Sequence, residues 1–153
     1  MGWSAAGALV VALMLVGCGG STAGGFADSV SDQYCPQFVE LVGHADALQD
    51  TSDLRAAAEG TRQYARIGEE LADDLDDLDP PDHVESEWRT FVRELGTSAR
   101  IQGTVIAALE RGDTARLREL RFELSAAHNQ YLESLQALED AGITLQCPVQ
   151  GQP

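Results

Sequence analysis

The fold is decided by the stretch GEELADDLDDLDPP, which spans residues 68–81. Leu71, Leu75 and Leu78 recur at intervals of four and three residues, with acidic side chains between them. This spacing places the leucines on one face of a helix and the carboxylates on the opposite face. Pro80-Pro81 predicts the end of that helix, because proline has no backbone N–H and disfavours helix in the residue before it.

The same periodicity recurs in four segments of the chain. They predict helices over about 36–48, 53–78, 83–111 and 114–141. After residue 17 no segment shows the alternating Val, Ile and Thr pattern of a strand. Amphipathic helices with short connections predict an all-α, up-and-down four-helix bundle. In the third segment the expected core positions are Val84, Trp88, Phe91, Val92, Leu95, Ile101, Val105 and Leu109.

Turn and cap residues separate these segments. Thr51 or Ser52 can cap the second helix, and Asp113 can cap the fourth. Gly112 predicts the end of the third helix, and Gly142 the end of the fourth. Gly96-Thr97-Ser98 lies inside the third segment and predicts a bend or a looser turn there.

The first seventeen residues have the composition of an export signal. The apolar run from Ala5 to Leu15 is too short to span a bilayer, which needs about 20 apolar residues. Leu15-Val16-Gly17-Cys18 matches the bacterial lipobox, in which cleavage precedes the cysteine and its thiol receives a diacylglycerol. We therefore expect Cys18 to carry fatty acyl chains such as palmitate. Because residues 1–4 contain no Lys or Arg, an ordinary signal peptide followed by a chance cysteine is the alternative.

These boundaries predict the organisation of the chain. Residues 1–17 are the expected lipoprotein signal peptide, and 18–34 the lipidated cysteine with a flexible, Gly-rich tether. Residues 35–148 are the expected bundle domain and 149–153 a tail. Cleavage would leave 136 residues (153 minus 17), enough for one domain with its own core.

Two cysteines remain once Cys18 is assigned to lipid. Cys35 precedes the first expected helix and Cys147 follows the last, and these two positions lie at the same end of an up-and-down bundle. An even pair outside the cytoplasm predicts a disulfide. The alternative is two buried free thiols.

The formal net charge of −15 limits the partners of the chain. A nucleic-acid partner is not expected, because phosphate contacts need basic patches. Adsorption to anionic lipid is also disfavoured, which leaves the acyl chains on Cys18 to hold the protein at the membrane. The expected partners are thus the membrane, through that anchor, and an unidentified envelope protein or ligand.

The densest run of charge lies at the end of the second expected helix. A Ca²⁺ ion would relieve the repulsion between its carboxylates, although the spacing and glycine of an EF-hand are absent. A solvated acidic face is the simpler interpretation. The candidate ligands are Glu69, Asp73, Asp76, Asp77 and Asp79.

Sequence motifs of catalysis are absent. There is no Gly-x-Ser-x-Gly, P-loop, Gly-x-Gly-x-x-Gly or Cys-x-x-Cys, and the three histidines fall in separate segments. We expect no cofactor and no enzyme activity, and a hydrolase is the least favoured hypothesis. Arg116, Arg118 and Arg121 form a basic start to the fourth helix that Glu119 and Glu123 can neutralise. Phe122 is off the apolar stripe and is a candidate exposed contact.

Several features resemble the small secreted helical lipoproteins of high-GC Gram-positive bacteria. They are Tyr34-Cys35, Leu75-x-x-Leu78-x-Pro80-Pro81, Trp88-x-x-Phe91 with Leu95, and Cys147-Pro148. The resemblance implies an extracytoplasmic helical domain and brings no activity or catalytic residues. Taken together, the sequence predicts a lipid-anchored helical binding or interaction module of the cell envelope. An acidic, Ca²⁺-binding lipoprotein is the alternative.

Overall fold

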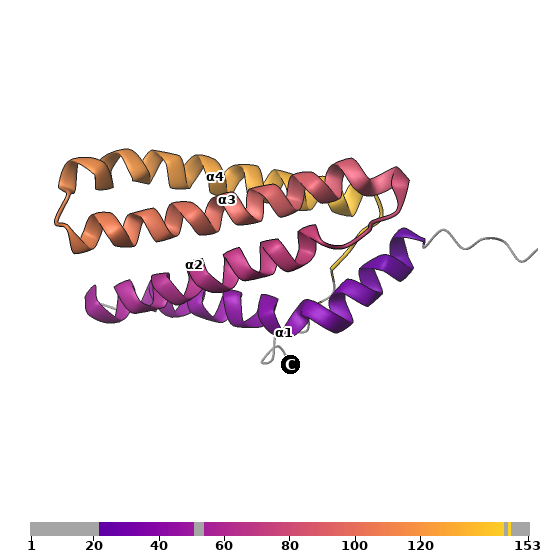
Figure 1. Ribbon diagram of the computed structural model, residues 1–153, viewed down its shortest axis with the longest axis horizontal. Coiled ribbons are helices and arrows are strands. Elements are labelled where there is room, and N and C mark those ends of the chain that lie inside the picture. The colour runs from indigo at the N-terminus through magenta and orange to yellow at the C-terminus, as the bar shows by residue number, and fades with distance from the viewer. Residues whose placement is uncertain (1–21, 51–53, 146, 148–153) are drawn as a thin grey trace, which may run out of the picture.

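The computed structural model of the chain describes residues 22–50, 54–145 and 147. Consecutive helices run antiparallel and pack in chain order, α1 on α2, α2 on α3 and α3 on α4 (Figure 1). The predicted all-α, up-and-down four-helix bundle is confirmed. Its elements are α1 (Ala23–Asp50), α2 (Leu54–Asp76), the 3₁₀ turn η1 (Asp82–Val84), α3 (Glu85–Glu110) and α4 (Thr114–Asp140).

The predicted stop and cap signals act as expected at the α3–α4 turn and at the end of α4. Gly112 and Gly142 have φ of +66° and +91°, a conformation that glycine adopts without steric cost. The N–H of Ile143 donates to the carbonyl of Leu138 at 2.9 Å, which closes the last turn of α4. Asp113 caps the start of α4 by accepting a hydrogen bond from the N–H of Arg116 at 3.0 Å. The expected cap at Thr51 or Ser52 lies outside the described residues.

The predicted tether is wrong for residues 23–34, which form the first half of α1. Thr22 starts this helix, because its hydroxyl accepts a hydrogen bond from the N–H of Gly25 at 3.1 Å. Phe26, Val30 and Tyr34 then recur every fourth residue and are buried. Burial of this apolar face outweighs the low helix propensity of the two glycines in the first turn.

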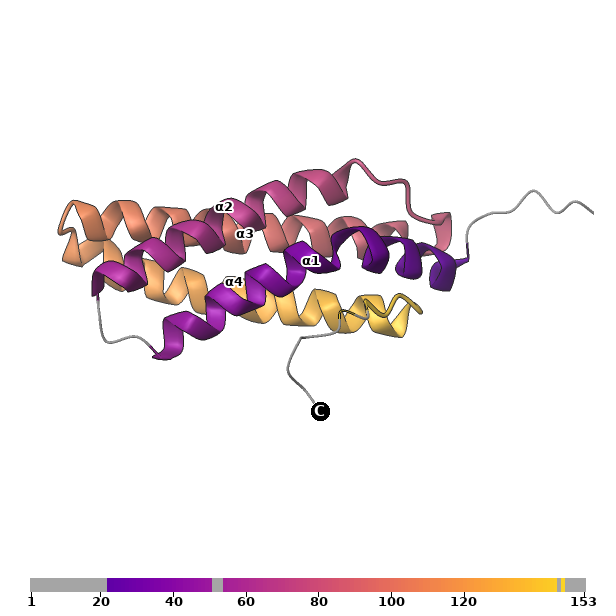
Figure 2. The ribbon, with the colours of Figure 1, turned by 90° about the horizontal axis from the view of Figure 1, so that it is seen from below.

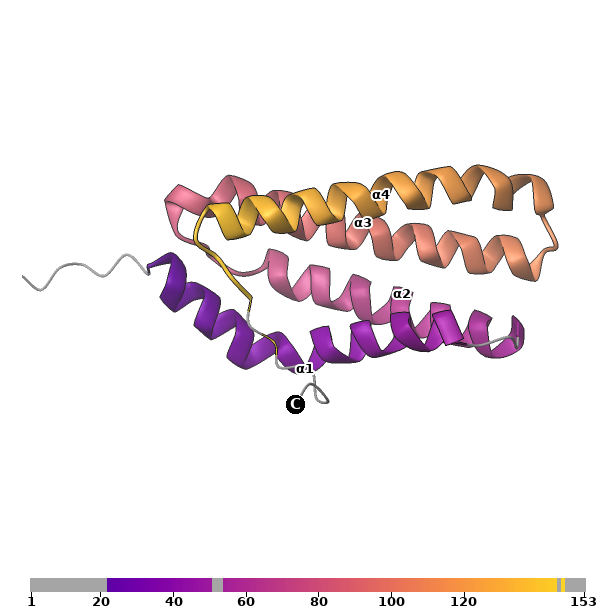
Figure 3. The ribbon, with the colours of Figure 1, turned by 180° about the vertical axis from the view of Figure 1, so that it is seen from behind.

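Pro36 divides α1 into two parts. It removes one helical hydrogen bond and its ring crowds the preceding turn, and Figure 3 shows α1 bent near its middle. Cys35 lies beside this proline and is joined to Cys147 with Cα atoms 5.1 Å apart, as the predicted disulfide requires. The expectation that Cys35 begins the domain is wrong, because Cys35 lies near the middle of α1. The chain after α4 runs back along the bundle to reach this point (Figure 3).

The core is richest in aromatic side chains where α1, α3 and the end of α4 meet. Trp88 and Phe91 are fully buried, with ring centroids 5.7 Å apart. Phe26 of α1 meets the Trp88 ring edge-on at 4.9 Å, and Tyr131 of α4 lies 5.9 Å from Phe91. Offset and edge-on ring pairs of this kind add stability beyond their buried area.

A layer of hydroxyl groups crosses the middle of the bundle. Burial raises the pKa of the Tyr64 phenol of α2, and the Ser98 hydroxyl of α3 partly opposes this shift. Burial, together with the neighbouring Tyr64, raises the pKa of Tyr131 to about 12. The buried hydroxyl of Ser134 donates to the carbonyl of Tyr131 at 2.7 Å.

Small residues allow α2 and α3 to approach closely. A Cβ atom added at Gly68 would lie 2.9 Å from the Cβ of Ala99, and one added at Gly96 would lie 3.3 Å from that of Ala72. Figure 2 shows α2 inclined to α3, whereas α3 and α4 lie side by side. The looser turn predicted at Gly96-Thr97-Ser98 does not form, because α3 is helical from Glu85 to Glu110. Gly96 makes room for the neighbouring helix.

Candidate functional site: the groove between α2 and α3

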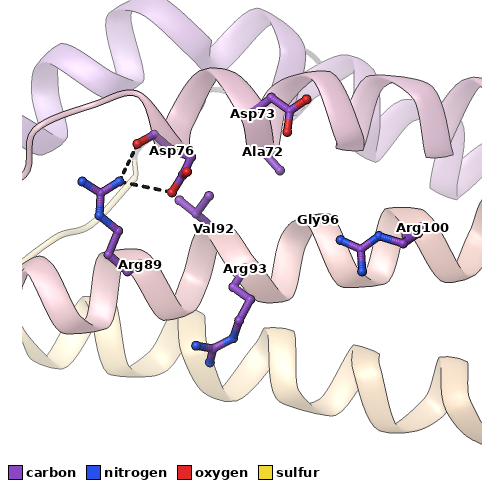
Figure 4. Close-up of a pocket in the computed structure, with 8 residues that line it drawn as sticks. All are labelled: Ala72, Asp73, Asp76, Arg89, Val92, Arg93, Gly96 and Arg100. Atoms are coloured by element: carbon purple, nitrogen blue, oxygen red, sulfur yellow. Dashed lines mark hydrogen bonds and ion pairs between the residues drawn. The ribbon is translucent and has the colours of Figure 1, made fainter.

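A groove of about 300 Å³ lies along the line where α2 and α3 meet (Figure 4). Its α2 wall carries acidic side chains and its α3 wall carries basic ones. Its floor is formed by the small residues at which α2 and α3 approach each other closely. The residues that line it are Ala72, Asp73, Asp76, Arg89, Val92, Arg93, Gly96 and Arg100.

One end of the groove is closed by hydrogen bonds that terminate α2. The Arg89 guanidinium donates to the backbone carbonyl of Asp76 and, at 3.2 Å, to its carboxylate. The indole N–H of Trp88 donates to the carbonyl of Leu75 at 3.2 Å. Helix C-terminal carbonyls lack partners within their own helix, so these two side chains of α3 satisfy them. Arg89 and Asp76 therefore have a structural role.

The other end of the groove holds charges that are not paired across it. Arg93 binds Glu94 on its own helix, with Nε 3.0 Å from the carboxylate, and its side chain is directed toward α4 (Figure 4). The Arg100 side chain runs back along α3 toward Gly96 (Figure 4). Within the described part of the chain, neither Arg100 nor Asp73 forms an ion pair. An uncompensated cation and anion thus face one groove from opposite helices.

The arginine row on α3 was not predicted, although the sequence carries a signal for it. Arg89, Arg93 and Arg100 are four and seven residues apart, which places them within about 40° of each other on one helical face. The prediction for this segment rested on its apolar stripe, which lies on a neighbouring face of the helix. The pairing with α2 depends on the tertiary contact at Gly96 and Ala72, which no local pattern reports.

The predicted cation site is not assembled. Asp73 and Asp76 line the groove, whereas Glu69, Asp77 and Asp79 are exposed elsewhere on the surface of α2 and the connection after it. Among the residues that the structure describes, no three His, Cys, Asp or Glu side chains are grouped to hold a metal ion. The carboxylates share a helix face but are spread along it, and one of them is bound to Arg89.

The basic start of α4 is neutralised only in part. Arg116 forms ion pairs with Glu119 at 3.0 Å and Glu123 at 2.8 Å, whereas Arg118 and Arg121 have no ion pair with another described residue. Phe122 is 77% exposed, as its position off the apolar stripe predicts. Cys18 lies outside the described residues. In the part of the chain that the structure describes, no helix is long and apolar enough to cross a membrane.

A second hollow of about 250 Å³ lies between α3 and α4. Thr90, Glu94, Glu133 and Ser134 are among the residues that line it. The Ser134 hydroxyl is bound to a carbonyl of its own helix, and Glu94 is bound to Arg93. These contacts tie Ser134 and Glu94 to the scaffold, and the two side chains do not form a nucleophile–base pair.

In comparisons with known proteins, the chain has no significant match to a family model, a curated protein or a solved structure.

Proposed function

We propose that this chain is a bacterial lipoprotein, anchored by acyl chains on Cys18, whose disulfide-linked bundle acts as a binding module outside the cytoplasm. The observation that carries the proposal is the Cys35–Cys147 disulfide, because such bonds persist in oxidising compartments. The lipobox Leu15-Val16-Gly17-Cys18 independently supports the same location outside the cytoplasm.

The start of α1 limits how far the bundle can stand from the anchor. Only five Cα–Cα steps separate Cys18 from Ala23, where α1 begins. Such a segment reaches at most about 18 Å when fully extended. A tether that included residues 23–34 would have allowed a wider range of positions. The bundle is thus expected close to the membrane, with the first turn of α1 nearest to it.

The end of the bundle nearest the anchor is acidic. The α2–α3 connection and the C-terminal end of α4 lie at the same end as the start of α1 (Figures 1 and 3). Asp79, Asp82, Glu139 and Asp140 are exposed there. Anionic headgroups repel these carboxylates over about a Debye length of 8 Å at physiological salt. The charge therefore favours a bundle that stands off the lipid and leaves its long faces open to solutes.

The groove between α2 and α3 lies on such a long face. Arg100 is fifteen residues into α3, which corresponds to about 22 Å from the acidic end of the helix. Asp73 and Arg100, the groove's two unpaired charges, are available to a ligand. We assign the binding role to this groove.

The anchor is tested by mass spectrometry of the N-terminal peptide from membrane fractions. The expected result is a peptide that starts at Cys18 and carries the mass of a diacylglycerol. Cys18→Ser should accumulate as the uncleaved precursor, and Ser21→Ala is the control, because it changes a nearby residue without touching the lipobox or the disulfide. An unmodified N-terminal peptide that begins at Met1 in the wild-type protein would overturn the proposal.

A further inference from the structure

We infer that the groove between α2 and α3 binds a small zwitterionic ligand, whose anionic group contacts Arg100 and whose ammonium group contacts Asp73. The inference deepens the binding role proposed above by naming the chemistry of the ligand. It rests on the placement of charge on the two walls of the groove and on the size of the space between them.

The two walls carry opposite charge, and an ion pair joins them at only one end of the groove. Arg89 and Asp76 compensate each other. Asp73 lies about one turn before Asp76 on α2, and Arg100 lies three turns beyond Arg89 on α3. Asp73 and Arg100 are therefore offset along the groove and form no ion pair with each other. A molecule with two opposite charges can bridge this offset.

The overall charge of the chain argues against a simple anion as the ligand. The protein has a net charge of −15, and Asp73 and Asp76 face the same groove as Arg100. An anion drawn to Arg100 would be repelled by Asp73, the carboxylate of the groove that Arg89 does not compensate. An ammonium group on the same molecule would be attracted by Asp73, and this attraction would offset the repulsion of the anionic group. For the same reason a simple amine, which Asp73 attracts, would be repelled by Arg100.

The size of the groove limits the ligand. A space of about 300 Å³ lies at the lower end of the range for small-molecule sites. It corresponds to about ten water molecules at about 30 Å³ each. Molecules of this size include phosphoethanolamine and a dipeptide, in which the ammonium group is paired with a phosphate or a carboxylate. Arg93 lies one turn from Gly96 and can add a second guanidinium by releasing Glu94.

Calorimetric titration of the full chain in neutral detergent tests the inference. The probes are phosphoethanolamine and alanyl-alanine, with inorganic phosphate and ethanolamine as single-charge controls. The expected result is saturable binding of at least one zwitterion, at least tenfold tighter than either single-charge control. Which zwitterion binds more tightly identifies the anionic group as phosphate or carboxylate.

Matched variants locate the site. Arg100→Gln and Asp73→Asn should each weaken zwitterion binding about tenfold or more, since each removes a charged hydrogen-bond partner. Arg118→Gln and Asp74→Asn make the same charge changes at exposed positions outside the groove and should leave binding unchanged. The backbone amide of Gly96 should shift in NMR spectra on binding, while that of Gly142 should not.

Three results would overturn the inference. They are the absence of saturable binding by either zwitterion at 10 mM, equal affinity for inorganic phosphate, and equal loss of binding in the two control variants. None of these results concerns the N-terminal peptide. Failure of the anchor and failure of the ligand chemistry are therefore measured separately.

Discussion

The two ends of the bundle are built differently. At the end where the chain enters α1 and leaves α4, which we call the aromatic end, the buried rings of Phe26 and Phe91 both contact Trp88. At the other end, which we call the leucine end, the turn at Gly112 joins α3 to α4. Here Leu109 is 47% exposed, and Ile101, Val105, Leu117 and Leu124 are only partly buried.

The difference follows from which segments cover each end. The first half of α1 and the chain after α4 both pack onto the aromatic end, and Ile143 of that chain is 1% exposed. The disulfide then joins these two segments. At the leucine end α1 packs mainly on α2, so the apolar stripes of α3 and α4 are covered there only by α2 and by each other. Stability should therefore be concentrated at the aromatic end.

Removal of the disulfide should produce the largest loss of stability. The bond spans 112 residues of sequence. For a loop near this length the chain-entropy model gives about 4.7 kcal/mol, and native strain subtracts from that value. Cys35→Ser combined with Cys147→Ser is therefore expected to lower the free energy of unfolding by about 3–5 kcal/mol in urea titrations.

Hydrogen exchange in the same double variant distinguishes the two ends. The amide of Ile143, bonded to the carbonyl of Leu138, should exchange faster because the segment that carries it is released from α1. The amide of Asp113, bonded to the carbonyl of Ala108, is the internal control at the leucine end. A loss of stability under about 1 kcal/mol, or equal acceleration at both amides, would contradict this account.

Leucine truncations at the two ends should differ next. Leu95 and Leu109 lie on the same helix, and their exposed fractions are 2% and 47%. Leu95→Ala should cost about 2–5 kcal/mol, because it leaves a cavity in a packed core. Leu109→Ala should cost under about 1 kcal/mol, since half of its side chain is already in water. Similar losses in thermal or urea unfolding would show that the leucine end is as well packed as the aromatic end.

Much of the fold could be predicted, because its signals are local. Helix spacing, the caps at Asp113 and Gly142 and the pairing of Cys35 with Cys147 all follow from residues read in order. The first half of α1 was missed because Gly-rich residues 19–25 obscured the spacing of Phe26, Val30 and Tyr34. Periodicity also predicted Leu109 as core. It identifies the apolar face of a helix but not whether another segment covers that face.

Most of the candidate site could not be predicted from the sequence. Asp73 and Asp76 were predicted as cation ligands together with three carboxylates that lie elsewhere, and the structure places these two on the α2 wall of the groove. Their basic partners are on α3, across a contact set by Gly96 and Ala72. A groove formed by two helices depends on their closest approach, and that distance is a tertiary quantity.

The hydroxyl layer between the two ends should make stability fall at high pH. The pKa of Tyr131 is raised to about 12 by burial and by Tyr64, whereas a tyrosine in the unfolded chain titrates near 10. The folded state therefore holds its proton more tightly. The resulting stabilisation is present below pH of about 10 and is lost as pH rises toward 12, by up to about 2–3 kcal/mol.

Urea unfolding at pH 9 and pH 11.5 checks this pH dependence, with phenolate absorbance at 295 nm as the probe of ionisation. Tyr131→Phe is the matched variant, since it keeps the ring beside Phe91 and removes the titrating group. Its stability should decline less than that of the wild-type protein over this interval. An identical decline in both proteins would assign the effect to other groups.

The smallest expected change in stability tests the close contact between α2 and α3. In Gly68→Ala the new Cβ would lie 2.9 Å from the Cβ of Ala99, so the helices must separate. Overpacking of this kind costs about 1–3 kcal/mol, partly offset by about 1 kcal/mol of helix propensity. Gly43→Ala is the control, because nothing lies within 4 Å of its new Cβ and propensity alone should stabilise α1.

A second substitution separates the steric cost of Gly68→Ala from any other cause. Adding Ala99→Gly removes the methyl group that the new Cβ would meet. The double variant loses helix propensity at residue 99 but regains the close approach, so the two changes should be non-additive in urea titrations. Strict additivity, or a stabilising effect of Gly68→Ala alone, would mean that α2 and α3 do not meet at this point. The groove beside Gly96 would then lose its floor.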